Sequence, residues 1–241
     1  MKKQFSFQRF IAVAATVMLM AGVLTACKKT DGVATRIPSA GLMVFNLAPD
    51  KDGIGVALSG NLVNSVPLRF TSYNGTYQSI YTGERNIQAL DLSDSIFAES
   101  TSTFEDNNYY SLFVTGNNGV YKAVTVKDDV DSSATADKAY VRYINAIPDS
   151  SAPQVTFAVS GTNILEGAAS FNTVTPFTAV SGGEVKVSLA GENMAADRTF
   201  TIENGHVYTV LLVGVPGATD AAKKVQIRFV ENGVIPASAD K

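Results

Sequence analysis

The chain has 241 residues, of which 46% are hydrophobic and 17% are charged, and its formal net charge is −3. This composition is typical of a globular protein, and the acidic balance argues against a nucleic-acid partner, which usually meets a basic face. The single Cys and the single His exclude a disulfide framework and metal sites built from several such residues. We therefore expect no metal and no cofactor, and a binding or structural role rather than catalysis.

The N-terminus has the pattern of an export signal. A positively charged start precedes an uncharged, largely apolar run over residues 10–23, which is too short to span a bilayer. Residues 24–27, Leu-Thr-Ala-Cys, look like the lipobox of bacterial lipoproteins. The sequence predicts a lipoprotein signal peptide over residues 1–26 and lipid on Cys27, which would anchor the protein to a membrane.

The residues after the lipobox indicate where the anchored protein would be sorted. Lys28 stands where an Asp would indicate inner-membrane retention, so by analogy with lipoprotein sorting we expect the outer membrane. Whether the protein faces the periplasm or the cell surface stays open. Residues 27–40 are interpreted as a lipidated tether.

The rest of the chain is one sequence repeated twice, with a period of about 100 residues. Residues 43–50 match residues 142–149, and both segments contain Asn-x-x-Pro-Asp. Further matches in the same order join 56–60 to 157–161, 77–80 to 177–180, 83–84 to 183–184 and 104–116 to 202–214. We predict domains over residues 41–130 and 140–233, a linker over 131–139 and a C-terminal tail over 234–241.

Each repeat has the pattern of β-strands. Val185, Val187 and Leu189 alternate with polar residues, which indicates a strand with one buried face. Residues 207–213 are nearly all apolar, which favours a central strand buried on both sides. Turn residues are frequent and helical periodicity is absent, so each repeat predicts a seven-stranded, immunoglobulin-like β-sandwich. We expect the two sandwiches to lie end to end, each with its own core.

Tyr110 and Tyr208 occupy matching positions just after a turn, near the start of an apolar strand. Sandwiches place a corner tyrosine there, with its ring in the core and its hydroxyl bonded to a nearby backbone group. The alternative is an ordinary aromatic residue of the core.

The repeats resemble a bacterial cell-envelope domain known only as a domain of unknown function, which has an Asn- or His-x-Ser-Pro-Asp turn. The second repeat matches this pattern at Asn145, Pro148, Asp149, Gly161, Phe177, Gly183 and Tyr208. The first repeat matches it more loosely at Asn46, Pro49, Asp50, Gly60, Tyr77, Gly83 and Tyr110. The resemblance implies a fold and an envelope location, and it carries no activity.

Candidate chemistry is sparse, and we predict no catalytic residue. His206 is interpreted as a turn residue because the first repeat has Asn108 at its position. Residues 50–53 resemble the start of a calcium loop but lack its later ligands. The acidic segments 105–108 and 128–131 are interpreted as solvated turns, although calcium binding there stays open.

The segment over residues 72–81 occurs in the first repeat only and contains Tyr73, Tyr77 and Tyr81. We predict these tyrosines as ligand contacts, with core or corner packing as the alternative. The resulting hypothesis is a lipid-anchored, non-catalytic module of the cell envelope that binds or displays a glycan or an envelope protein. The alternatives are a glycan-directed hydrolase that uses carboxylates and a structural spacer.

Overall fold

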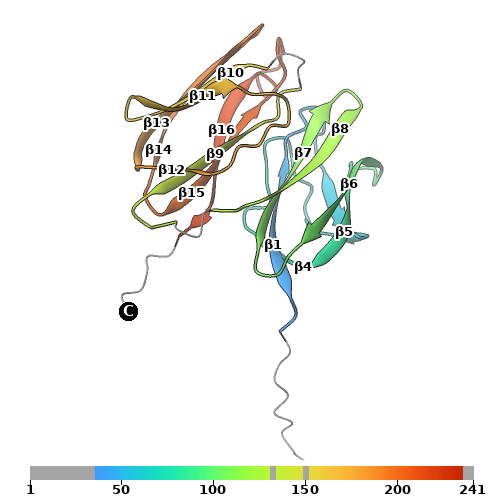
Figure 1. The fold of residues 1–241 in the computed structure, drawn as a ribbon. Helices are drawn as coiled ribbons and strands as arrows, with labels where there is room; N and C mark the ends of the chain where they lie inside the picture. Colours follow the sequence, from blue (N-terminus) through green and yellow to red (C-terminus); the bar gives the residue numbers. More distant parts are fainter. Residues whose placement is uncertain (1–35, 131–133, 149–151, 236–241) are drawn as a thin grey trace, which may run out of the picture. The chain divides into compact units, whose positions relative to one another are not determined.

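The structure is a computed structural model that describes residues 36–130, 134–148 and 152–235 (Figure 1). The predicted signal peptide and Cys27 lie outside the described residues. The regular elements in the described ranges are all β-strands, which confirms the all-β fold class. Within those ranges, no helix could cross a membrane.

The first repeat is a sandwich of two four-stranded sheets, with the strand orders β4-β1-β7-β8 and β3-β2-β5-β6. Strands β1 and β7 run parallel, and the other pairs are antiparallel. Apolar residues from both sheets form the core between them. The strands are β1 (Ser39–Asn46), β2 (Gly55–Leu58), β3 (Asn61–Leu62), β4 (Gln78–Tyr81), β5 (Gly83–Leu90), β6 (Ile96–Phe104), β7 (Tyr109–Asn117) and β8 (Val120–Lys127).

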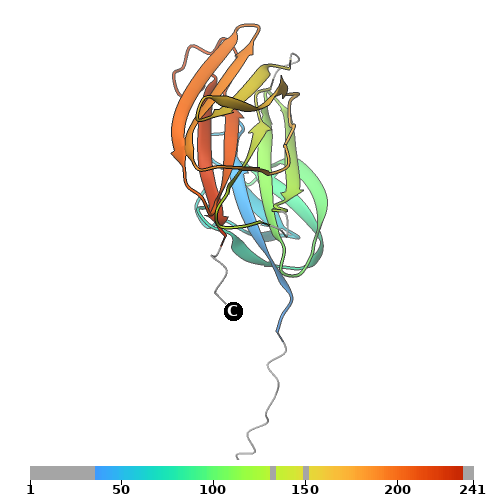
Figure 2. The ribbon, with the colours of Figure 1, turned by 60° about the vertical axis from the view of Figure 1, so that its left-hand side comes forward.

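The second repeat has the same topology, with the strand orders β12-β9-β15-β16 and β11-β10-β13-β14 (Figures 1 and 2). Its own core lies between these sheets. Each repeat thus has eight described strands, not the expected seven, because short edge strands such as β3 and β12 give little signal in the sequence. The strands are β9 (Ala139–Asn145), β10 (Gln154–Val159), β11 (Thr162–Ala168), β12 (Thr178–Val180), β13 (Gly183–Gly191), β14 (Met194–Ile202), β15 (His206–Val213) and β16 (Gln226–Val234).

The Asn of the repeated Asn-x-x-Pro-Asp motif stabilises the fold through side-chain hydrogen bonds to the backbone. Asn46 and Asn145 are both buried at the end of the first strand of their repeat. In both, the side-chain amide donates to a loop carbonyl at 2.8 Å, that of Leu68 or Ala169. In both, the side-chain oxygen accepts the N–H two residues further on at 3.0 Å. The Asn of the motif therefore joins the end of the first strand to a nearby loop through the same buried hydrogen bonds in both repeats.

The central strands bury both of their faces. Along β1, Leu42 and Val44 point into the core of the first repeat. Met43 and Phe45 instead join a separate apolar cluster with Ile144 and other residues of the second repeat. We call this the seam cluster; its buried members are Met43, Phe45, Leu47, Phe113, Ile144, Ala146, Leu211, Val213 and Val230.

The seam cluster corrects the expectation that the two sandwiches lie end to end. Its residues come from sheet β4-β1-β7-β8 of one repeat and sheet β12-β9-β15-β16 of the other, so these two sheets pack face to face. The apolar run over residues 207–213 follows from this packing. One set of alternate side chains fills the core of the second repeat, and the other set fills the seam.

Candidate functional site at the seam

The strand register identifies which residues of the two repeats are equivalent at the seam. Met43 on β1 is paired with Ser111 on β7, and Arg142 on β9 is paired with Thr209 on β15. Arg142 therefore occupies the position of Met43, and Thr209 occupies that of Ser111.

Two more equivalent pairs differ between the repeats. Tyr77 directly precedes β4 and Phe177 directly precedes β12, and both strands pair with the first strand of their repeat. Asp128 and Asn232 each come one residue after the strand partner of the corner tyrosine. Four equivalent positions thus carry unlike residues.

Arg142 lies in the seam with only 3% of its surface exposed. Its Nη2 lies 2.7 Å from Oδ1 of Asp128 and donates to Ser111 Oγ at 2.8 Å, so it reaches two residues of the first repeat. Its Nε donates to Thr209 Oγ1 at 3.0 Å within its own repeat. The Phe177 ring lies 4.2 Å from the guanidinium carbon and covers it.

The remaining contacts close these residues into a ring. Thr209 donates to Asn232 Oδ1 at 2.6 Å, and Asn232 Nδ2 donates to the Tyr77 hydroxyl at 3.1 Å. Tyr77 and Ser111 both donate to Asp128 Oδ2, at 2.5 and 2.7 Å. We call this set the polar ring; its members are Tyr77, Ser111, Asp128, Arg142, Thr209 and Asn232.

The ring pairs a buried cation with a buried anion and supplies hydrogen bonds to both. A buried network of this kind holds a specific geometry, and loss of one charged partner leaves the other buried without compensation. Burial, and then the negative charge of Asp128, raise the pKa of the Tyr77 hydroxyl. Tyr77 therefore stays protonated and keeps donating to Asp128.

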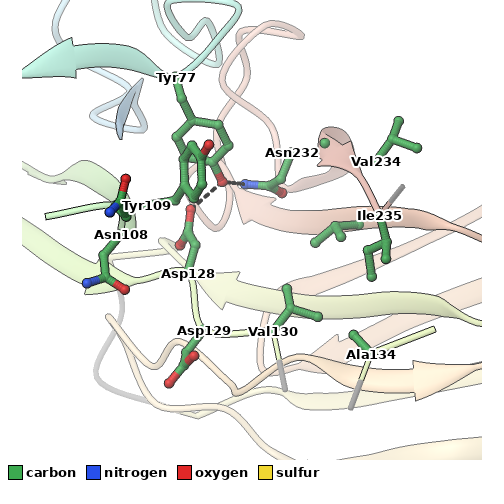
Figure 3. Close-up of a pocket in the computed structure, with 13 residues that line it drawn as sticks. Tyr77, Asn108, Tyr109, Asp128, Asp129, Val130, Ala134, Asn232, Val234 and Ile235 are labelled. Atoms are coloured by element: carbon green, nitrogen blue, oxygen red, sulfur yellow. Dashed lines mark hydrogen bonds between the residues drawn. The ribbon is translucent and has the colours of Figure 1, made fainter. Parts of the chain in front are cut away.

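An open groove of about 620 Å³ lies beside the ring (Figure 3). Figure 3 shows Tyr77 and Asp128 from the first repeat meeting Asn232 from the second at the groove. Its lining draws on the same parts of both repeats: residues 107–109 and 128–130 of the first, and residues 207 and 232–235 of the second, with Ala134 between them.

Tyr109 is the more exposed of the two tyrosines that line the groove, with 55% of its surface exposed. Its ring lies 4.9 Å from that of Tyr77, edge to face. A Cβ on Gly41 would lie 2.5 Å from Cδ1 of Tyr109, so the glycine makes room for this ring against β1. The second repeat has Val207 at this position. Sequence reasoning missed Tyr109, although the unlike residue at the matching position was the available signal.

The structure does not bring the three predicted ligand contacts together. The Tyr73 ring stacks on Phe45 at 5.4 Å and packs against the seam cluster, as the core alternative described. Tyr77 lines the groove, with its hydroxyl in the polar ring. Tyr81 is 66% exposed and lines a separate pocket of about 310 Å³ near Leu62.

His206 and the acidic turns have local partners. His206 is the first residue of β15, and its Nδ1 lies 3.1 Å from Oε1 of Glu231 on β16. The carboxylate of Asp50, in the segment that resembles a calcium loop, accepts from the Tyr121 hydroxyl and from the Asn118 N–H. In the described ranges, no group of three or more His, Cys, Asp or Glu residues could hold a metal ion.

The fold and the groove define a class: a protein of two tandem β-sandwiches joined face to face, with a candidate binding groove where they meet. The model of a domain of unknown function, DUF4397, matches residues 40–152 and 139–241, so the chain belongs to this family and carries two copies of its domain. This agrees with the resemblance to a tandem domain of unknown function.

One of the solved structures that match aligns with most of this chain. It is described as a "putative cell adhesion protein" from Bacteroides eggerthii DSM 20697; it shares 11% identity, the match covers 83% of this chain and 96% of that one, and the TM-score is 0.25. At that score the similarity carries no argument about this chain. No curated protein matches the sequence.

Proposed function

We propose that the protein is a non-catalytic binding module, held at the bacterial outer membrane by lipid on Cys27, and that the groove beside the polar ring receives its partner. The lipobox and Lys28 support the anchor and its membrane. Membership of a family without an assigned activity is compatible with a binding role.

The observation that carries the proposal is that buried contacts fix both walls of the groove. Tyr77 and Asp128 line it from the first repeat and Asn232 lines it from the second, and all three are members of the polar ring. A groove formed before binding loses little conformational entropy when a partner enters. This favours binding over a role as a passive spacer.

The chemistry of the groove suits a glycan or a peptide segment of an envelope protein. Tyr109 offers an aromatic surface, Val234 an apolar one, and Asn108 and Asp129 polar groups. Aromatic anchors of this kind often dominate the free energy of binding.

The hydrolase alternative needs two carboxyl groups that are available to act as general acid and as base or nucleophile. Among the described groove residues, the carboxylates belong to Asp128 and Asp129, and Asp128 is held by Arg142, Ser111 and Tyr77. The groove therefore supports binding better than acid–base cleavage.

The test is retention of the purified protein on a panel of envelope and dietary glycans and envelope proteins, with product release measured in parallel. Tyr109→Ala should weaken retention roughly tenfold or more without a large change in melting temperature. Tyr81→Ala, which removes an exposed tyrosine outside the groove, is the matched control and should retain the partner.

Three results would contradict the proposal. Loss of retention in Tyr81→Ala alone would move the contact surface to the smaller pocket. Product release that disappears in Asp129→Asn would make the protein an enzyme. Absence of any retained partner would favour the spacer.

A further inference from the structure

We propose that the polar ring is a pairing code: it lets the first repeat pack on the second repeat and excludes pairing of like repeats between two copies of the chain. This inference does not depend on the ligand or on the membrane anchor. It rests on the four pairs of equivalent seam positions, Met43 and Arg142, Tyr77 and Phe177, Ser111 and Thr209, and Asp128 and Asn232.

The need for a code follows from the repetition. The two sheets that meet at the seam have the same strand order and come from homologous sequences. Each repeat therefore offers a largely apolar face built on the same strand order, and a face of this kind can meet a copy of itself in a two-fold contact. The apolar residues of the seam cluster favour burial in either arrangement.

The charged positions remove this ambiguity. In the observed pairing, one Arg142 meets one Asp128 at 2.7 Å. Two first repeats would bring together two Asp128 side chains and two Met43 side chains, so the buried carboxylates would have no cation. Two second repeats would bring together two Arg142 side chains and two Asn232 amides, without a carboxylate. Both like pairings leave buried charge uncompensated.

A neutral contact across the seam reinforces the same choice. Asn232 Nδ2 donates to the Tyr77 hydroxyl at 3.1 Å, whereas Phe177 at the matching position has no hydroxyl to accept this bond. The contacts of Tyr77 with Asp128 and of Phe177 with Arg142 lie within one repeat, so they position the charged side chains and do not themselves select the partner. In the observed pairing the first repeat contributes Tyr109 to the groove and the second contributes Val207 at the matching position.

The decisive experiment exchanges the code between the repeats of the full chain. The mirrored variant carries Met43→Arg, Tyr77→Phe, Ser111→Thr and Asp128→Asn together with Arg142→Met, Phe177→Tyr, Thr209→Ser and Asn232→Asp. Two half-exchanged variants carry only the first four or only the last four substitutions. The half-exchanged variants are the matched controls, because they place two arginines or two aspartates at the seam.

The measurements are the radius of gyration from small-angle scattering, the oligomeric state from light scattering, and the rate of proteolysis in the linker between the repeats. The mirrored variant should be a monomer with the radius and cleavage rate of the unchanged chain. The half-exchanged variants should have a larger radius and should be cleaved on the order of a hundredfold faster. Circular dichroism shows whether the sheets remain folded in each variant.

The proposal is overturned if the half-exchanged variants keep the radius and cleavage rate of the unchanged chain, or if the mirrored variant opens as they do while its sheets persist. If the mirrored variant does not fold, the smaller cycle of Arg142→Met, Asp128→Asn and their combination decides. Recovery of a slow cleavage rate in the double variant supports the code, and additive losses contradict it.

Discussion

At the scale of single residues, the corner tyrosines show how much a repeated position can predict. The Tyr110 hydroxyl accepts the Glu105 N–H at 3.0 Å, and the Tyr208 hydroxyl accepts the Glu203 N–H at 3.2 Å. Both rings are buried. The corner interpretation is thereby confirmed in both repeats, with the backbone donor five residues before each tyrosine.

Tyr208→Phe should lower the free energy of unfolding by about 1–3 kcal/mol, because the Glu203 N–H loses its acceptor. Chemical denaturation measures this change. Tyr143→Phe is the control, since the Tyr143 ring is buried but its hydroxyl has no hydrogen-bond partner in the described ranges. Equal losses in the two variants would mean that the corner hydrogen bond adds nothing.

Tyr77 should make the protein sensitive to alkali. Burial and then Asp128 raise the pKa of its hydroxyl in the folded state, whereas an unfolded tyrosine has a pKa of about 10. The folded state thus holds the proton to higher pH, and this contribution to stability is present below pH ~10 and is lost as the pH rises further.

Tyr77→Phe should therefore make the fall in unfolding free energy above pH ~10 less steep, as measured by urea denaturation across a pH series. Part of the fall should remain, because burial also raises the pKa of Tyr143 and of Tyr208. Tyr81→Phe changes an exposed ring and is the matched control. A slope identical to that of the unchanged chain would contradict the prediction.

At the scale of elements, the turns at the ends of the central strands restrict the residue type as strictly as the cores do. Gly116 at the end of β7 and Gly214 just after β15 have positive φ angles of 114° and 112°. A Cβ on Gly116 would lie 2.1 Å from the Val120 oxygen, and one on Gly214 would lie 2.3 Å from the Lys224 oxygen. Both repeats thus need glycine there, for its backbone freedom and for the close approach of the next strand.

Gly116→Ala and Gly214→Ala should each lower the free energy of unfolding by more than about 2 kcal/mol, because backbone strain and a steric clash add. Gly75→Ala separates these effects, since Gly75 has a φ of 86° but no atom within 4 Å of an added Cβ. It should cost about 1–2 kcal/mol. Thermal unfolding measures all three, and equal losses would show that the clash relaxes at no cost.

At the scale of the whole molecule, the seam turns two repeated domains into a pair with unlike roles. The first repeat supplies Asp128 and the exposed Tyr109, and the second supplies Arg142 and Val207. The repeated residues Asn46 and Asn145 hold the fold, whereas the residues that differ form the polar ring and the groove. Membrane anchoring would then present this pair of domains at the envelope.

Cys27→Ser should abolish labelling of the chain with radioactive palmitate, because the thiol is the predicted site of lipid attachment. Lys28→Asp is the matched variant: it should still be labelled but should fractionate with the inner membrane. Palmitate labelling of Cys27→Ser would show that the lipid is attached elsewhere. Unchanged outer-membrane fractionation of Lys28→Asp would contradict the sorting argument.

The sequence by itself determined the repeat, the all-β class and the corner tyrosines, because these depend on local alternation, turn residues and the spacing of a single repeat. It also indicated a central strand over residues 207–213, since a run without polar alternation must bury both faces. It could not identify what covers the second face, because a partner sheet and a ligand demand the same apolar residues.

Only the tertiary structure decided the partners of the seam. Tyr77 and Asn232 are 155 positions apart in the chain, yet they share a hydrogen bond. From the sequence, Asp128 is interpreted as part of a solvated acidic turn, but the structure buries its carboxylate 2.7 Å from Arg142. Tyr73 and Tyr81 look alike in the sequence, but one stacks in the seam cluster and the other is exposed. The physical reason is that charge compensation and burial depend on distances in space, which folding sets by packing one repeat against the other.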